Sequence, residues 1–329
     1  MDDKRLLLCR PQGGLNDMLC QIEKACSYAD AFARTVIVET DYCHSKTFHD
    51  AFAHYFVAIN PKHILTTQGL ALDFDAFSVV PHELFGRVSR YSAHYDHDSG
   101  NHVDDQSEVL TSFDMDRDHS ENLLIHHACG WVPGLSIKAL SRFQLRDEIL
   151  QELSRRLALL GPGYTAFHIR DTDYRTNYQQ KILQVAKKVR GALFVATDNY
   201  ESVEFCRSVF GNDRVFSFSD LPNEAGLPLH YFQGDINVYS RNRDALVDLL
   251  MLALSRKYFF FPLAYSARTG NSAPRYSGFS MLAQELRQQP RILRKLIGNR
   301  ENIALPSMRS RYVGKAQDFY RMLHDKVFY

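Results

Sequence analysis

With 329 residues, the chain is long enough for two domains of about 150 residues, each with its own core. Its 39 Lys and Arg residues balance 38 Asp and Glu residues, and the net charge of +1 argues against a dedicated nucleic-acid binder, which usually shows a large basic excess. Six cysteines without a CxxC pair argue against a disulfide scaffold and a structural zinc site. No apolar run is long enough for a signal peptide or a membrane span, so we expect a soluble cytoplasmic protein.

The first elements alternate strand, helix and strand. Leu6–Cys9 is a short apolar run typical of a buried strand, and a Gly13-Gly14 turn follows it. Across residues 15–33, apolar side chains recur at steps of three and four, which predicts an amphipathic helix. Residues 35–39 predict a second strand, and this order of elements is typical of a parallel sheet.

The region from 40 to 120 is less regular. Its most polar stretch, residues 94–105 (HYDHDSGNHVDD), has the residue types of a metal site. The spacing matches no ligand template, so it predicts a flexible polar loop. Residues 123–127 predict one more strand, on which His126 and His127 must point to opposite faces.

After residue 140 the alternation restarts, which predicts a second α/β domain with a parallel sheet. The fold class is therefore α/β, and the chain divides into residues 1–140, residues 141–288 and a basic tail of residues 289–329. The expected strands are 164–169, 192–196, 214–218 and 258–261, and the expected helices are 145–160, 179–190, 201–210, 244–256 and 279–287.

Ligands of open α/β sheets bind beyond the carboxyl ends of the strands. Residues 168–175 (HIRDTDYR) follow the strand at 164–169, and Arg170 and Arg175 are suited to phosphate because guanidinium offers planar, permanently charged donors. The alternative is a surface loop in which Arg170 pairs with Asp173.

Three other segments lie at comparable places. Asp198 follows a strand and can accept a hydrogen bond from a base or a ribose hydroxyl, but residues 197–198 would also serve as an ordinary helix cap. Residues 277–280 (SGFS) precede a helix whose free N–H groups suit an anion, again with a cap as the alternative. Residues 13–17 (GGLND) follow the first strand and match neither a dinucleotide fingerprint nor a P-loop.

In this order, the four segments resemble those of the fucosyltransferase-like superfamily, which includes alpha-1,6-fucosyltransferases, nodulation fucosyltransferases and protein O-fucosyltransferases. The marks are GGLN at 13–16, HIRDTD at 168–173, ATD at 196–198 and SGFS at 277–280, of which HIRDTD is the most specific. The resemblance covers residues 164–288 and, in the first half, only the opening loop. The chain departs from the alpha-1,6 pattern at Asp171, where a second arginine is usual.

The resemblance implies a GT-B architecture, with two Rossmann-like domains facing across a cleft. Residues 1–140 would then bind the acceptor, residues 141–288 would bind the donor, and the tail would pack back on the first domain. Arg170, helped by Arg175, would hold the donor diphosphate, and Asp17 or Asp173 would serve as general base. The implied donor-binding residues are Gly13, Gly14, Asn16, His168, Arg170, Thr172, Arg175, Asp198, Asn199, Ser277, Gly278, Phe279 and Ser280.

The resemblance also implies a metal-independent, inverting glycosyltransferase of bacterial surface-polysaccharide biosynthesis, such as that of O-antigen or capsule. Its donor would be a nucleotide sugar such as GDP-fucose, and its acceptor a glycan or lipid-linked glycan. Transfer from a phosphoribosyl-type donor and a non-catalytic glycan-binding role are the alternatives. From Arg287 onward, ten Lys and Arg residues face three acidic residues. This excess predicts peripheral contact with an anionic membrane, with a solvated basic helix face as the alternative.

Overall fold

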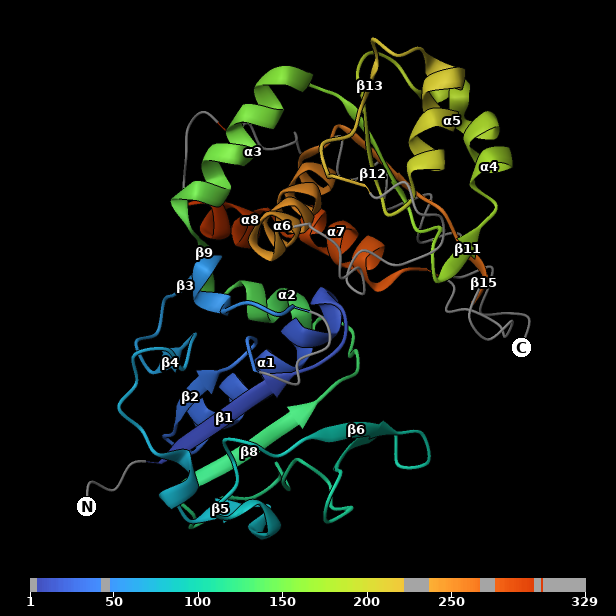
Figure 1. Ribbon diagram of the computed structural model, residues 1–329. Coiled ribbons are helices and arrows are strands. Elements are labelled where there is room, and N and C mark those ends of the chain that lie inside the picture. Colours follow the sequence, from blue (N-terminus) through green and yellow to red (C-terminus); the bar gives the residue numbers. More distant parts are fainter. Residues whose placement is uncertain (1–4, 43–47, 222–236, 267–275, 299–302, 304–329) are drawn as a thin grey trace. The chain divides into compact units, whose positions relative to one another are not determined.

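The structure is a computed structural model that describes residues 5–42, 48–221, 237–266, 276–298 and 303. The chain forms two compact units, Met1–Arg146 and Asp147–Tyr329, each built on its own parallel sheet (Figure 1). The division falls a few residues beyond the position expected from sequence, because residues up to 145 still pair with the first unit: β9 (Phe143–Leu145) lies antiparallel to β3 (Phe56–Ala58). None of the described helices is long and apolar enough to cross a membrane.

The first unit contains a five-stranded sheet in the order β4-β2-β1-β8-β5, and all four strand pairs are parallel. This agrees with the predicted strand–helix–strand opening and with the strand predicted at 123–127. The strands are β1 (Leu6–Pro11), β2 (Thr35–Val38), β4 (His63–Ile64), β5 (Val79–Val80) and β8 (Leu123–Ala128), and the helices are α1 (Leu15–Ala31) and α2 (Leu135–Leu140).

The alternation of side chains along these strands separates two faces of the sheet. Leu6 and Leu8 of β1 belong to a core cluster with Leu84 and Tyr91, from the segment that leads out of β5. On β8, Nε2 of His126 lies 3.0 Å from the Gln21 amide oxygen of α1, whereas His127 faces Tyr91. The prediction that the two histidines face opposite sides is therefore confirmed.

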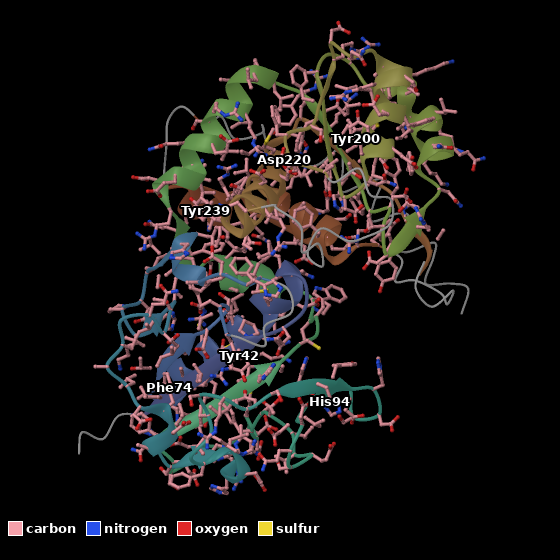
Figure 2. The ribbon with its side chains drawn as sticks, viewed as in Figure 1. Tyr42, Phe74, His94, Tyr200, Asp220 and Tyr239 are labelled. Atoms are coloured by element: carbon pink, nitrogen blue, oxygen red, sulfur yellow. The ribbon has the colours of Figure 1, made fainter. Side chains whose placement is uncertain are left out.

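The polar stretch at 94–105 is a β-hairpin, so the prediction of a flexible loop there is wrong. Its strands are β6 (Ala93–Asp96) and β7 (Asn101–Asp104), and His94 lies on the first of them (Figure 2). Asp104 is buried and accepts two hydrogen bonds from Arg87, at 2.8 and 2.7 Å, which fixes the hairpin from outside its own sequence. Among the described residues, no group of His, Cys, Asp and Glu is arranged to hold a metal ion.

The second unit contains a four-stranded parallel sheet in the order β13-β12-β10-β14. The predicted strands and helices are all present within a few residues, except that α6 begins six residues before the predicted 244, at Val238. The strands are β10 (Thr165–Ile169), β12 (Leu193–Thr197), β13 (Val215–Phe216) and β14 (Lys257–Phe260), and the helices are α3 (Asp147–Leu160), α4 (Tyr178–Val185), α5 (Tyr200–Phe210), α6 (Val238–Leu254), α7 (Gly278–Gln288) and α8 (Pro290–Ile297).

Helices cover both faces of this sheet. Phe167 and Ile169 of β10 pack in one cluster with side chains of α4 and α5, while α6 contacts β10 and β12. A buried guanidinium ties α3 to α6, because Arg156 pairs with Asp248 at 3.0 Å and also with Asp244. Burial raises the pKa of Asp248 to about 7, against the opposing effect of Arg156.

Two short strands that the sequence analysis did not predict lie beside the carboxyl end of β10. Here β11 (Tyr174–Thr176) pairs antiparallel with β15 (Leu263–Ser266). Helix α8 buries Leu293, Leu296 and Ile297 and contacts α7, and Gly298 ends it in the left-handed conformation. Beyond Gly298, the predicted basic tail lies outside the described residues except for Ile303.

Candidate functional site

Arg170 is the first residue after β10, where an apolar strand gives way to a run of charged residues. Its guanidinium lies between two carboxylates: Nη2 is 2.6 Å from Oδ1 of Asp173, and Nη1 is 2.9 Å from Oδ2 of Asp198. The ion pair with Asp173 considered in the sequence analysis is therefore present. The Arg170 side chain keeps 21% of its surface exposed, so its remaining N–H donors can reach a ligand.

Asp198 joins the HIRDTD and ATD segments, as their shared place at the carboxyl ends of neighbouring strands predicts. One of its oxygens accepts the backbone N–H of Asp171 at 2.8 Å, and the other accepts the hydroxyl of Thr172 at 2.6 Å. With Arg170, these partners engage both carboxylate oxygens. Asp198 and Thr172, both expected to bind the donor, thus shape the arginine loop from within.

Asp171 and Asn199 form a second contact between the same segments. The Asn199 amide nitrogen donates to the Asp171 carbonyl at 3.2 Å and to its carboxylate at 3.1 Å, while its oxygen accepts from the backbone N–H of Glu201 and caps α5. The cap considered as an alternative is present, though Asn199 provides it. Burial raises the pKa of Asp171, and the half-exposed Arg175 lies 3.7 Å from its carboxylate.

The late serine segment meets the arginine loop through His168. Nδ1 of this buried histidine lies 2.6 Å from the hydroxyl of Ser280, and the ring of Phe279 lies beside the imidazole with 5.1 Å between centroids. Burial, and secondarily the charge of Arg170, lowers the pKa of His168 to about 3. At neutral pH the imidazole is therefore uncharged.

The N-terminus of helix α7 lies next to this contact, and no side chain of the described residues caps it. Its N-cap Ser277 makes no side-chain hydrogen bond to the helix, and the first intrahelical bond is from Met281 to the Ser277 carbonyl. The backbone N–H groups of Gly278, Phe279 and Ser280 therefore have no intrahelical acceptor, an arrangement that favours an anion. The Ser280 hydroxyl is engaged with His168, so backbone groups and Ser277 remain for a ligand.

The glycine loop of the first unit, residues 13–17, leads into an α1 N-terminus whose N-cap residue likewise makes no side-chain hydrogen bond. Gly13 has φ +95°, and Gly14 caps the helix without a side chain. Asp17 receives a hydrogen bond from the Gly14 backbone, while burial raises its pKa. Asn16 is only 5% exposed, and its amide oxygen and nitrogen have no hydrogen-bond partner among the described residues. A buried amide without partners is rare in native proteins, so its donors and acceptor remain for a ligand or water.

An aromatic and charged cluster, which was not predicted from the sequence, lies at the carboxyl ends of β1 and β2. Arg10 is buried with its guanidinium 3.7 Å from the ring centre of Tyr42 and 4.9 Å from that of Tyr91, and its Nε is 2.6 Å from Glu39. The hydroxyl of Tyr91 in turn lies 3.0 Å from Nδ1 of His127. The only signal in the sequence was an arginine inside an apolar strand.

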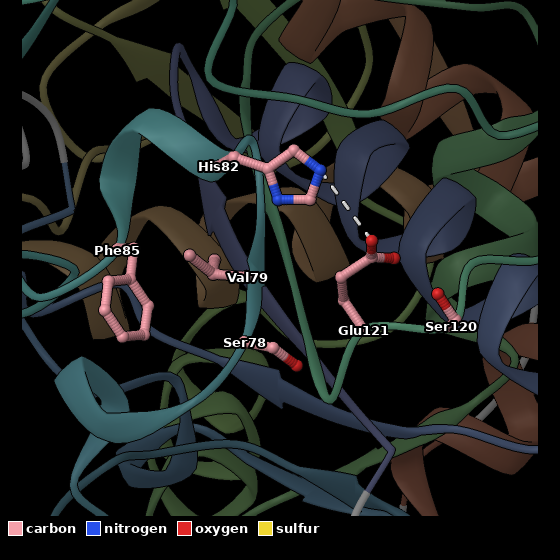
Figure 3. A pocket seen from close by; sticks show the side chains of 6 residues that line it. All are labelled: Ser78, Val79, His82, Phe85, Ser120 and Glu121. Atoms are coloured by element: carbon pink, nitrogen blue, oxygen red, sulfur yellow. Dashed lines mark ion pairs between the residues drawn. The ribbon is translucent and has the colours of Figure 1, made fainter.

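One pocket of the first unit, of about 410 Å³, lies at the opposite, amino-terminal edge of the sheet (Figure 3). Val79 and Phe85 form its apolar part, and His82 faces Glu121 at 3.7 Å. His82 is 73% exposed. None of the four motif segments contributes to this pocket.

These contacts place three of the four motif segments in one site of the second unit, at the carboxyl edge of a parallel sheet. No protein-family model and no curated protein sequence matches the chain. Its fold does match solved structures: the chain has the GT-B fold of the fucosyltransferases. The predicted α/β class and the predicted resemblance are thus confirmed at the level of the fold, whereas a cleft between the two units stays a prediction.

Two particular proteins represent this fold. The fucosyltransferase NodZ from Bradyrhizobium matches with a TM-score of 0.57 and 18% identity over 86% of this chain and 93% of that chain. A NodZ alpha-1,6-fucosyltransferase soaked with GDP-fucose matches with a TM-score of 0.55 and 18% identity, over 86% and 92%. POFUT1 in complex with GDP matches with a TM-score of 0.51 and 11% identity, over 91% and 98%. Because one fold serves many functions, the site must carry the argument for activity.

Proposed function

We propose that the protein is a glycosyltransferase of the fucosyltransferase type, which transfers a sugar from a nucleotide donor to a glycan acceptor. The observation that carries this proposal is the position of Arg170, which two carboxylates hold at the carboxyl end of β10. His168, two residues before it, contacts Ser280 in the first turn of α7. NodZ soaked with GDP-fucose and POFUT1 in complex with GDP have the same fold, which supports GDP-fucose as the first donor to test.

The chemistry of transfer fits these groups. The bond from the sugar to the diphosphate breaks as the acceptor oxygen attacks, so negative charge develops on the departing phosphate. Preorganised cations and backbone N–H groups stabilise such charge. Arg170, Arg175 and the first turn of α7 would supply this stabilisation without a metal ion, and attack from the side opposite the leaving group would invert the anomeric centre.

The general base has two candidates. Asp17 lies at the N-terminus of α1, where burial raises the pKa of its carboxyl toward the range useful for a base. Asp173 lies beside Arg170, but its carboxylate is paired with the guanidinium. The raised pKa favours Asp17.

A thermal-shift panel with GDP, UDP, CDP, GDP-fucose and phosphoribosyl diphosphate tests the donor class, because a ligand that binds only the folded state raises the melting temperature. A selective shift with GDP or GDP-fucose supports the proposal. A shift with phosphoribosyl diphosphate alone contradicts it and indicates a phosphoribosyl-type donor. Binding without turnover of GDP-fucose, assayed with a range of glycan acceptors, favours a non-catalytic glycan-binding protein.

We further propose a role in bacterial surface-polysaccharide synthesis, such as that of O-antigen or capsule, at the cytoplasmic face of the membrane, with a lipid-linked glycan as acceptor. Within the described residues, α8 supports membrane contact because Arg291, Arg294 and Lys295 are exposed while its apolar side is buried. Each such cation contributes about 1 kcal/mol near an anionic lipid surface. Sedimentation with anionic liposomes at low salt should recover the protein in the pellet, and its absence there would remove this proposal.

A further inference from the structure

We propose that the two carboxylates beside Arg170 have different roles. Asp198 anchors the guanidinium permanently, whereas Asp173 is a counter-ion that the donor phosphate displaces. The inference rests on the proposed function, since it concerns how a diphosphate enters that same site.

The anchor follows from the burial and the partners of Asp198. Its side chain is 6% exposed, and its oxygens accept the Asp171 backbone N–H, the Thr172 hydroxyl and Nη1 of Arg170. Separating Arg170 from it would leave a buried carboxylate without its charged partner, which is strongly unfavourable. Nη1 of Arg170 therefore stays where Asp198 holds it.

Asp173 has the opposite properties. Its side chain is 24% exposed. Besides Nη2 of Arg170, the partners of its Oδ1 atom within the described part of the chain are its neighbours, the Tyr174 backbone N–H at 3.0 Å and the Thr172 hydroxyl at 3.4 Å. Partly exposed ion pairs of this kind contribute little because water replaces either partner. Nη2 of Arg170 is therefore the donor that can change partners.

A phosphate is the better competitor for that donor, because it carries more charge and more acceptor oxygens than a carboxylate. While Asp173 remains on Nη2, a phosphate oxygen approaching Arg170 meets a like charge. The two carboxylates therefore oppose each other in their effect on binding. Neutralising Asp173 removes a competitor, whereas neutralising Asp198 releases Arg170 from its place.

The test is calorimetric titration of inorganic pyrophosphate and of GDP into the wild-type chain and its variants. D173N should bind both probes about 1.5- to fivefold more tightly, the range expected from loss of one partly exposed competing ion pair. D198N should bind them at least tenfold more weakly. E204Q is the matched control, since Glu204 pairs with Arg207 on α5 at the same 2.6 Å and its neutralisation changes the net charge equally; its affinity should remain that of the wild type.

The double variant D173N/D198N separates positioning from simple damage to the fold. If Asp198 positions Arg170, the D173N substitution no longer tightens binding once Asp198 is neutralised; equal tightening in both backgrounds overturns the anchor. Unchanged or weaker binding by D173N overturns the exchange while leaving the proposed function intact. Failure of the wild type to bind pyrophosphate and GDP overturns both.

Discussion

Nδ1 of His168 lies 2.6 Å from the hydroxyl of Ser280, although 112 positions separate the two residues in the chain. The contact connects the end of β10 to the first turn of α7. It thereby brings the guanidinium of Arg170 and the uncapped helix N-terminus to the same side of the sheet. Positive charge and free backbone donors are the two features that a diphosphate requires.

Replacing Ser280 with alanine should destabilise the protein and weaken donor binding. The substitution leaves Nδ1 of the buried His168 without its partner, at a cost of about 1–3 kcal/mol. S208A is the control, because the Ser208 hydroxyl bonds the Phe205 carbonyl on an exposed part of α5. Thermal denaturation should show a lower melting temperature for S280A alone. Equal melting temperatures for the two variants would mean that the contact contributes no stability.

Catalysis should require the planar guanidinium of Arg170 and its several N–H donors, and not only a positive charge at this position. Lysine keeps the charge but cannot bond two carboxylates and a phosphate in one plane. We expect R170K to lose at least 100-fold in transfer rate. R170A should also lose about 1–3 kcal/mol of stability, since it leaves the buried Asp198 without its cation. Initial-rate and melting measurements on both variants check this, and substantial turnover by R170A would contradict the assignment.

Gly13 should tolerate no side chain. Its φ of +95° is unfavourable for other residues, and an added Cβ would lie 2.9 Å from Cβ of Asp17. Gly69 has a comparable φ of +78° but open space around it, so G69A measures only the cost of placing a Cβ on a backbone with positive φ. We expect G13A to melt at a lower temperature than G69A and to lose more activity. Identical melting temperatures would show that the loop adjusts without cost.

Asp248 should make the stability of the protein depend on pH. Its pKa is raised by burial to about 7, above the value of about 3.9 for an unfolded aspartate, so the folded state holds its proton over a range where the unfolded state has lost it. This contribution is fully present below pH 4 and is lost as the pH rises to about 7. Asn keeps the size of the side chain but does not ionise. The melting temperature of wild type relative to D248N should therefore fall between pH 4 and pH 7 and level off above pH 7, and a constant difference would contradict the raised pKa.

The longer parallel strands and most helices were predictable because their apolar spacing is local, whereas the two-residue strands β4 and β5 were not predicted. The sequence missed what depends on distant partners. A loop was predicted at residues 94–105 because they are polar. The segment forms a hairpin because Arg87 pairs with the buried carboxylate of Asp104. Residues 238–243 of α6 were missed because residues 240–243 are all polar.

The site divides in the same way. The four segments could be found in the sequence, and the clustering of the three that belong to the second unit could be predicted, since strand order brings strand ends together. The roles of individual residues could not, because they depend on distances between segments. Asp198 bonds Thr172 and Arg170, and its expected contact with a nucleotide stays a prediction. Asn16 was expected from the resemblance, whereas only the structure shows that its amide is buried and has no hydrogen-bond partner among the described residues.

The carboxylate of Asp171 accepts the Thr176 backbone N–H and the Asn199 side-chain N–H. An arginine at this position would direct its own donors at those donors, so restoring the two-arginine pattern by D171R alone should disturb the loop. An acceptor at 199, such as aspartate, would remove the conflict with the side chain of residue 199, although the Thr176 backbone N–H would still face position 171. Positions 171 and 199 therefore form a single unit of evolutionary change: in related chains, arginine at the first should occur together with an acidic residue at the second.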